Sequence, residues 1–169
     1  MYDAFKRITA NALAALVMTL FSVQPVFGET ASHEPASGHE RTHTYHPNSM
    51  AVFVGVTHEG SESGASLAIE YERRLSKSFG VGVVVERTFG NLDFWLYAVP
   101  FAYHSGRWKF YVAPGVADGK HGSESLLRIG AEYAFDFGDW ELSPQINGDF
   151  VDDNEAVVLG FTIGRGFGQ

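Results

Sequence analysis

Cysteine is absent from the 169-residue chain, which excludes disulfide scaffolds and thiolate zinc sites and leaves the chain unaffected by an oxidising compartment. Basic residues are scarce, because 12 Lys and Arg stand against 20 Asp and Glu. A nucleic-acid surface needs a basic patch, so we expect no nucleic-acid partner. A glycine loop of the phosphate-binding kind is also missing, since many of the 19 glycines alternate with large residues. We therefore expect no cofactor.

An apolar run occupies residues 8–23, directly after Lys6 and Arg7. It is followed by Pro25 and a small-residue site that ends at Gly28. A positive start, a short apolar core and a small residue before the cut are typical of a secretory signal peptide. The run contains Thr and Asn and is short for a membrane span. We interpret residues 1–28 as a signal peptide and not as a membrane anchor.

Residues 29–49 form a polar leader with almost no aliphatic side chains and two prolines, so they cannot bury enough surface to fold alone. The leader contains His33, His39, His43 and His46, and imidazole is a common metal ligand. The spacings of six, four and three residues impose no preformed geometry. A solvated, disordered linker is the favoured interpretation, and a metal-binding leader is the alternative.

From Met50 to the end the sequence alternates between apolar and small or polar residues, with breaks at Gly, Ser, Asp or Asn. This period of two predicts β-strands, and no segment of residues 50–169 keeps a helical period. Eight segments joined by short turns predict an all-β fold, an antiparallel up-and-down barrel. Each segment is long enough to cross a bilayer, for which a tilted strand needs about 9–11 residues. The segments are 50–59, 64–75, 78–88, 92–104, 107–117, 124–137, 140–150 and 155–167.

The two faces of these segments distinguish a membrane barrel from a soluble lipocalin-like barrel. One face collects bulky apolar side chains such as Tyr97, Val99 and Phe161, whereas the other collects glycine and charged residues. The interior of an eight-stranded barrel is only just wide enough for side chains, so the bulky set must face lipid. Aromatic residues near the segment ends fit the girdles at the membrane interfaces. We therefore expect a transmembrane barrel with small and paired polar residues in its lumen.

The segments GASLAIEYERRLSKSFGVGVVVE, YVAPGV and LLRIGAEYAFDFG carry a family resemblance. Residues 50–169 resemble small outer-membrane barrels of the OmpA/OmpX type and a broad set of uncharacterised bacterial outer-membrane β-barrel proteins. Residues 157–167 resemble the C-terminal signal read by the barrel-assembly machinery, although the chain continues to Gln169. The resemblance implies the outer membrane of a Gram-negative bacterium, with lipid and the assembly machinery as partners. We expect a monomer.

Charged residues on the inward face form a second group of candidates. Charges in a narrow interior are costly unless they are paired, so a salt-bridge plug is favoured over an ion path lined by excess acid. Turns of the predicted lengths place Lys109 opposite Glu132 and Arg128 opposite Asp149. The predicted lumen network contains Glu70, Glu72, Arg74, Glu86, Lys109, Arg128, Glu132, Glu141 and Asp149.

The sequence His121-Gly-Ser123-Glu124 is a catalytic candidate in the connection 118–123. A His and a Ser two residues apart on a strand face the same way, and a nearby acid can orient the His. The pattern is weakly similar to the His-x-Ser of outer-membrane lipid A deacylases. A polar loop tip is the favoured interpretation. We therefore expect a structural or accessory cell-envelope barrel without catalysis that provides at most a minor solute path. An outer-membrane hydrolase and a metal-binding envelope protein are the alternatives.

We predict that the chain is cut near Gly28 during export. Mass spectrometry of the protein recovered from the expressing cell should give a mature N-terminus at or near Glu29. Retention of residues 1–23 in the recovered protein would contradict this topology.

Overall fold

The computed structural model describes residues 46–120, 122–152 and 154–168. The predicted signal peptide and the leader before His46 lie outside the described residues. No described helix is long and apolar enough to cross a membrane. The described residues form ten strands: β1 (Asn48–Glu59), β2 (Glu62–Arg74), β3 (Phe79–Gly90), β4 (Phe94–Ala98), β5 (Phe101–Ser105), β6 (Trp108–Gly119), β7 (Gly122–Tyr133), β8 (Phe135–Phe137), β9 (Trp140–Val151) and β10 (Asn154–Phe167).

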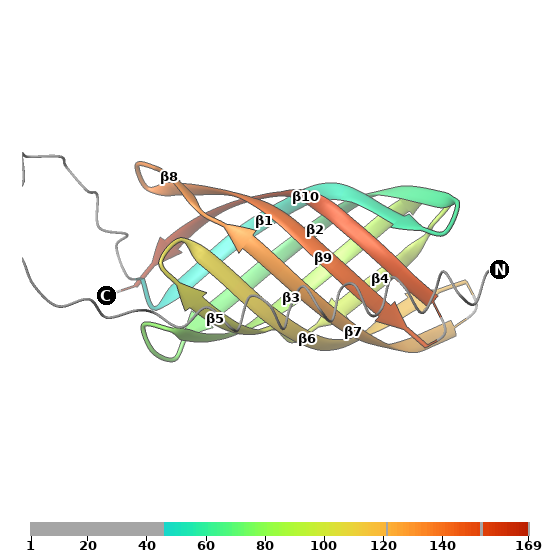
Figure 1. Cartoon of the computed structure of the whole chain (residues 1–169), viewed down its shortest axis with the longest axis horizontal. Helices are drawn as coiled ribbons and strands as arrows, with labels where there is room; N and C mark the ends of the chain where they lie inside the picture. Colours follow the sequence, from blue (N-terminus) through green and yellow to red (C-terminus); the bar gives the residue numbers. More distant parts are fainter. Residues whose placement is uncertain (1–45, 121, 153, 169) are drawn as a thin grey trace, which may run out of the picture. The chain divides into compact units, whose positions relative to one another are not determined.

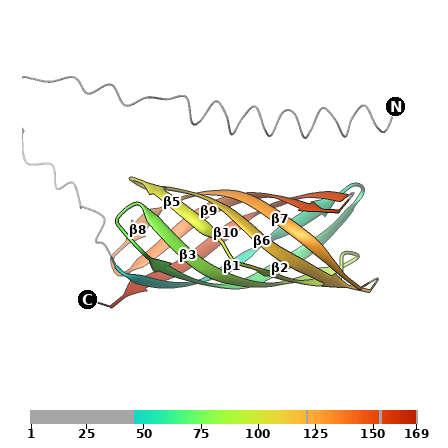
Figure 2. The same ribbon diagram turned by 90° about the horizontal axis from the view of Figure 1, so that it is seen from below.

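The ten strands make one antiparallel sheet that closes on itself (Figures 1 and 2). β1 pairs with β2 on one side and with β10 on the other, where Asn48 lies opposite Phe167. β4 and β5 together form one barrel strand between β3 and β6, and β7 and β8 together form another beside β9. The sheet is therefore a closed eight-stranded barrel, as the sequence predicts. We call the end near Asn48 and Phe167 the terminal end and the opposite end the distal end.

Two barrel strands are interrupted, one between β4 and β5 and the other between β7 and β8, and backbone hydrogen bonds bridge both gaps. Pro100 separates β4 from β5, because proline has no N–H to donate to the ladder. The backbone still bridges the gap, since Gly82 N donates to Pro100 O at 2.9 Å and Val99 N donates to Pro114 O at 2.9 Å. Between β7 and β8, Ala134 N donates to Arg107 O at 2.8 Å. The wall of the barrel therefore continues across both interruptions.

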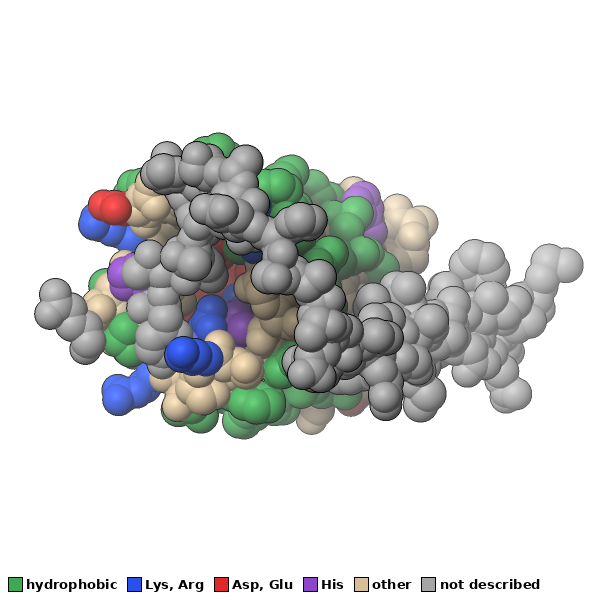
Figure 3. Space-filling view, turned by 60° about the vertical axis from the view of Figure 1, so that its left-hand side comes forward, with side chains coloured by type: hydrophobic (Ala, Val, Ile, Leu, Met, Phe, Trp, Pro, Cys, Tyr) green, Lys and Arg blue, Asp and Glu red, His purple; other side chains and the backbone are tan. Residues whose placement is uncertain are grey.

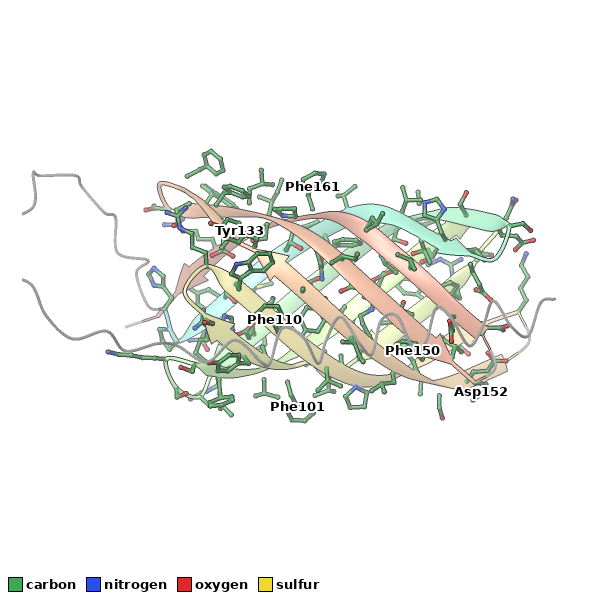
Figure 4. The ribbon with its side chains drawn as sticks, viewed as in Figure 1. Phe101, Phe110, Tyr133, Phe150, Asp152 and Phe161 are labelled. Atoms are coloured by element: carbon green, nitrogen blue, oxygen red, sulfur yellow. The ribbon has the colours of Figure 1, made fainter. Side chains whose placement is uncertain are left out.

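The outward face of the barrel is apolar, as the sequence predicts. Exposed fractions reach 58% for Ile69, 57% for Phe161 and 54% for Phe101. In Figure 4 the labelled side chains Phe101 and Phe161 point away from the ribbon. Soluble monomers rarely expose apolar area on this scale, whereas a membrane barrel turns such a band toward lipid.

Aromatic rings gather near both ends of the apolar band. At the terminal end the ring centroids of Trp108 and Tyr133 lie 4.9 Å apart, and those of Tyr133 and Phe135 lie 5.0 Å apart. At the distal end Trp95 stacks on Tyr97 with 6.3 Å between the centroids. Tryptophan and tyrosine favour the two membrane–water interfaces, so the clusters mark where a bilayer would begin and end.

The predicted register of the charged strands is confirmed. Lys109 lies opposite Glu132, and Arg128 lies opposite Asp149. Three connections at the distal end are shorter than predicted, however, and the connection between β2 and β3 is longer. The segment 118–123 is not a loop, because Asp118 pairs with Ser123 in the ladder. Only two residues, 120 and 121, join β6 to β7.

The interior is more apolar than predicted, which corrects the expectation that small and polar groups alone fill the lumen. Phe53 is 1% exposed and belongs to a buried cluster with Leu96 and Val158. Its ring lies over Gly160, where an added Cβ would come within 2.5 Å of Phe53 Cε2. Because Gly160 has no side chain, the phenyl ring of Phe53 can fill the space beside it.

Candidate functional site

The barrel encloses two cavities that open at opposite ends. The terminal vestibule has a volume of about 390 Å³, and Glu70 and Lys109 are among its lining residues. The distal vestibule has a volume of about 270 Å³, and Glu59 and Leu126 are among its lining residues. Figure 3 looks toward the terminal end, where charged side chains and a histidine lie in the hollow of a hydrophobic outer surface. The two cavities have no described lining residue in common.

Side chains that are almost fully buried separate the two vestibules. Hydroxyl groups contribute a short ladder, with Thr57 Oγ1 lying 2.6 Å from Ser66 Oγ and Ser66 Oγ lying 2.9 Å from Thr88 Oγ1. We call the whole set the central plug. It contains Phe53, Thr57, Ser66, Glu86, Thr88, Leu96, Arg128, Asn147, Asp149 and Val158.

Arg128 is the ionic centre of the central plug. Its Nε and Nη2 atoms donate to Asp149 Oδ1 and Oδ2 at 2.6 and 2.7 Å. Its Nη1 atom donates to Glu86 Oε2 at 2.6 Å. The exposed fraction is 2% for Arg128, 0% for Glu86 and 2% for Asp149. A guanidinium suits this position because its planar fork of donors serves two carboxylates at once.

A chain of neutral polar groups crosses the lumen beside the ionic centre. Thr162 Oγ1 donates to Gln145 Oε1 at 2.8 Å, and Gln145 Nε2 donates to the Tyr111 hydroxyl. The Tyr111 hydroxyl donates to Asn147 Oδ1 at 2.5 Å. An added Cβ at Gly130 would lie 2.6 Å from the Tyr111 hydroxyl, so glycine leaves the room that the ring needs. These four hydrogen-bonded residues were not part of the predicted lumen network, which contains only Glu, Asp, Arg and Lys.

In the terminal vestibule Glu72 contacts three cationic or protonatable side chains. His104 Nε2 lies 2.6 Å from Glu72 Oε1, Arg74 Nε lies 3.2 Å from the same atom, and Lys109 Nζ lies 3.6 Å from Glu72 Oε2. Lys109 Nζ also lies 2.7 Å from Glu132 Oε1. Sequence reasoning missed His104. The alternation that places Ala102 inward would also have placed His104 inward.

The structure divides the nine predicted lumen residues between two places. Glu86, Arg128 and Asp149 meet in the central plug. The other six line the terminal vestibule: Glu70, Glu72, Arg74, Lys109, Glu132 and Glu141.

The catalytic candidate is not assembled by the described residues. The Ser123 hydroxyl donates to Asp118 Oδ1 at 2.6 Å. Glu124 lines the distal vestibule and is the neighbour of Ser123 in a strand, so the two side chains point to opposite faces. His121 lies outside the described residues.

The metal-binding candidate falls mostly outside the described residues, which include neither His33, His39 nor His43. His46 is described and lines the terminal vestibule. Over the described ranges, no group of three or more His, Asp or Glu side chains is arranged to hold a metal ion.

Comparisons with known proteins bear on the fold. No family model and no curated protein matches the sequence. Among solved structures, the N-terminal β-barrel domain of OprF from Pseudomonas aeruginosa is similar with a TM-score of 0.56 and 14% identity, over 72% of this chain and 98% of that one. A de novo designed transmembrane β-barrel is similar with a TM-score of 0.51 and 14% identity, over the same shares of the two chains.

The chain has the fold of a small outer-membrane β-barrel. The similarity at this identity concerns the fold alone. In this outer-membrane-type barrel the lumen is divided by charged residues from β3, β7 and β9 and by the apolar side chains around Phe53.

We predict that Arg128→Met lowers the free energy of unfolding of the barrel by about 3–5 kcal/mol, because it leaves two buried carboxylates without their cation. Urea titrations in lipid vesicles, followed by tryptophan fluorescence, measure this loss. Adding Glu86→Gln and Asp149→Asn to the same variant should recover much of it.

The matched control is Arg165→Met, which removes an exposed pair with Asp139 in which the two side chains are 55% and 73% exposed. Exposed pairs contribute about 0–1 kcal/mol. An Arg128→Met loss no larger than that of Arg165→Met would contradict the importance assigned to the buried ionic centre.

Proposed function

We propose that this protein is exported through a cleaved signal peptide at residues 1–28 and spans the bacterial outer membrane as a monomeric structural or accessory barrel without catalysis. The apolar outward face and the two aromatic clusters support a lipid environment. Outer-membrane lipid and the barrel-assembly machinery are the partners that this location requires.

The observation that carries the accessory role is the central plug. Its ionic centre and apolar side chains lie between the two vestibules, which supports a resting barrel that is closed to solutes. The fold also offers little surface for a receptor, because every connection between barrel strands has only two to four residues. A closed barrel with short connections suits a role in the envelope itself.

The charge of the lumen determines what an opened barrel would pass. The distal vestibule is lined by one lysine, Lys120, and five carboxylates, one of which is Asp149 of the central plug. In the central plug two carboxylates share Arg128. An acidic lumen attracts cations and repels anions, so any minor solute path is selective for small cations.

Single introduced thiols test the location and orientation, since the chain has no native cysteine. Ser61→Cys lies in the distal connection between β1 and β2 and should react with an impermeant reagent in intact cells. Ser105→Cys at the terminal end should react only after the outer membrane is opened. Labelling of Ser105→Cys alone in intact cells would reverse the proposed orientation, and recovery of the protein as a soluble periplasmic species would contradict the membrane location.

Conductance across planar bilayers tests the closed lumen. The wild-type barrel should show no stable conductance, whereas Arg128→Ala should give a small, cation-selective conductance because it removes the guanidinium that joins Glu86 to Asp149. Arg165→Ala is the control, and heat-dependent gel mobility establishes that each variant is folded. Steady conductance of the wild-type protein equal to that of Arg128→Ala would contradict the plug.

A further inference from the structure

The terminal vestibule contains more acidic than basic side chains. Six carboxylates line it, against four Arg and Lys side chains. The acids are Glu70, Glu72, Glu132, Asp136, Asp139 and Glu141, and the bases are Arg74, Arg107, Lys109 and Arg165. Three of the four basic side chains contact an acid near the mouth: Arg74 contacts Glu72, Arg107 contacts Asp136 and Arg165 contacts Asp139. The fourth base, Lys109, contacts Glu132 and Glu72.

Glu70 lies at the inner end of this vestibule. It belongs to β2, where it faces Ala51 of β1 and Val84 of β3 across the ladder, so neither neighbouring strand supplies a charge. Its exposed fraction is 9%, yet it lines the cavity. The polar side chain of Gln145, which is neutral, lies near its carboxylate. Glu70 is thus a buried carboxylate that remains accessible from the vestibule.

The basic groups whose charge acts on Glu70 are Lys109 and Arg128, and both are engaged elsewhere. Lys109 Nζ lies between Glu132 and Glu72, at 2.7 and 3.6 Å. Arg128 is shared by two other carboxylates in the central plug. Among the described residues, no base forms an ion pair with Glu70. A buried carboxylate favours a cation or a proton nearby, and the open side of Glu70 is the vestibule.

We propose that the terminal vestibule binds a small organic cation that carries a primary ammonium or guanidinium group, with that group donating hydrogen bonds to Glu70. A cavity of about 390 Å³ has room for such a molecule. N–H donors on a cation make charge-assisted hydrogen bonds to a carboxylate, which are stronger than neutral ones. A bare metal ion is less suited, because the described residues provide no group of three acidic or histidine ligands. This site does not depend on whether the central plug opens.

Calorimetric titration of the folded full chain in detergent micelles with 1,4-diaminobutane tests the proposal. We expect saturable binding to the wild-type protein and an affinity at least about tenfold weaker for Glu70→Gln, which removes one charge and keeps the shape. Glu62→Gln is the matched control, because it removes an exposed carboxylate from the distal vestibule and should leave the affinity unchanged. Butane-1,4-bis(trimethylammonium), which has the same two charges but no N–H donor, should bind weakly to both proteins.

Several results would overturn the site. They are no saturable binding by the wild-type protein, equal weakening by Glu70→Gln and Glu62→Gln, or equal affinity for 1,4-diaminobutane and butane-1,4-bis(trimethylammonium). Ser49→Trp provides a second variant if Glu70→Gln does not fold. Ser49 lines the vestibule, so the larger side chain should block binding without removing a charge. Wild-type affinity in Ser49→Trp would place the cation elsewhere.

Discussion

The hydrogen bonds between β1 and β10 close the sheet, and the rest of the structure depends on that closure. Twelve residue pairs, from Asn48 with Phe167 to Glu59 with Ala156, leave neither strand with an open edge. In hydrocarbon an unpaired backbone group costs several kcal/mol, so only a closed sheet is stable there. Closure with eight strands also makes the interior narrow, which in turn decides what the inward-facing side chains can be.

Within that narrow interior, large side chains are possible only where a neighbour is small. Phe53 occupies the space above Gly160, and Tyr111 occupies the space beside Gly130. Charged side chains are possible only where several polar groups converge, as they do around Arg128. The lumen therefore has a cavity at each end and closely packed side chains in the middle. The packing of large side chains and the pairing of charges therefore both close the middle of the lumen between the two vestibules.

The sequence predicted the number of strands, the lipid-facing side and the pairing of Arg128 with Asp149, because each depends on local alternation and short turns. It did not predict contacts across the barrel. Glu86 meets Arg128 from β3, and no turn length relates these strands directly. The inward position of Phe53 was also missed, since bulky apolar side chains otherwise face lipid and this ring fits only beside glycine. Turn residues such as Asp118 were assigned to a loop because polar residues near a break look alike whether or not they pair.

The pairing of the first and last strands has a consequence for the order of the chain. Asn48 and Phe167 are neighbours in the sheet, and residues 60 and 61 form a two-residue connection at the other end. Exposed tight connections and adjacent ends are the conditions under which circular permutation is tolerated. The chain could therefore begin at any of several connections around the barrel without changing which strands are neighbours. The fold requires only that the strands follow one another in this order around the barrel. The position of the chain ends matters for how the barrel is assembled.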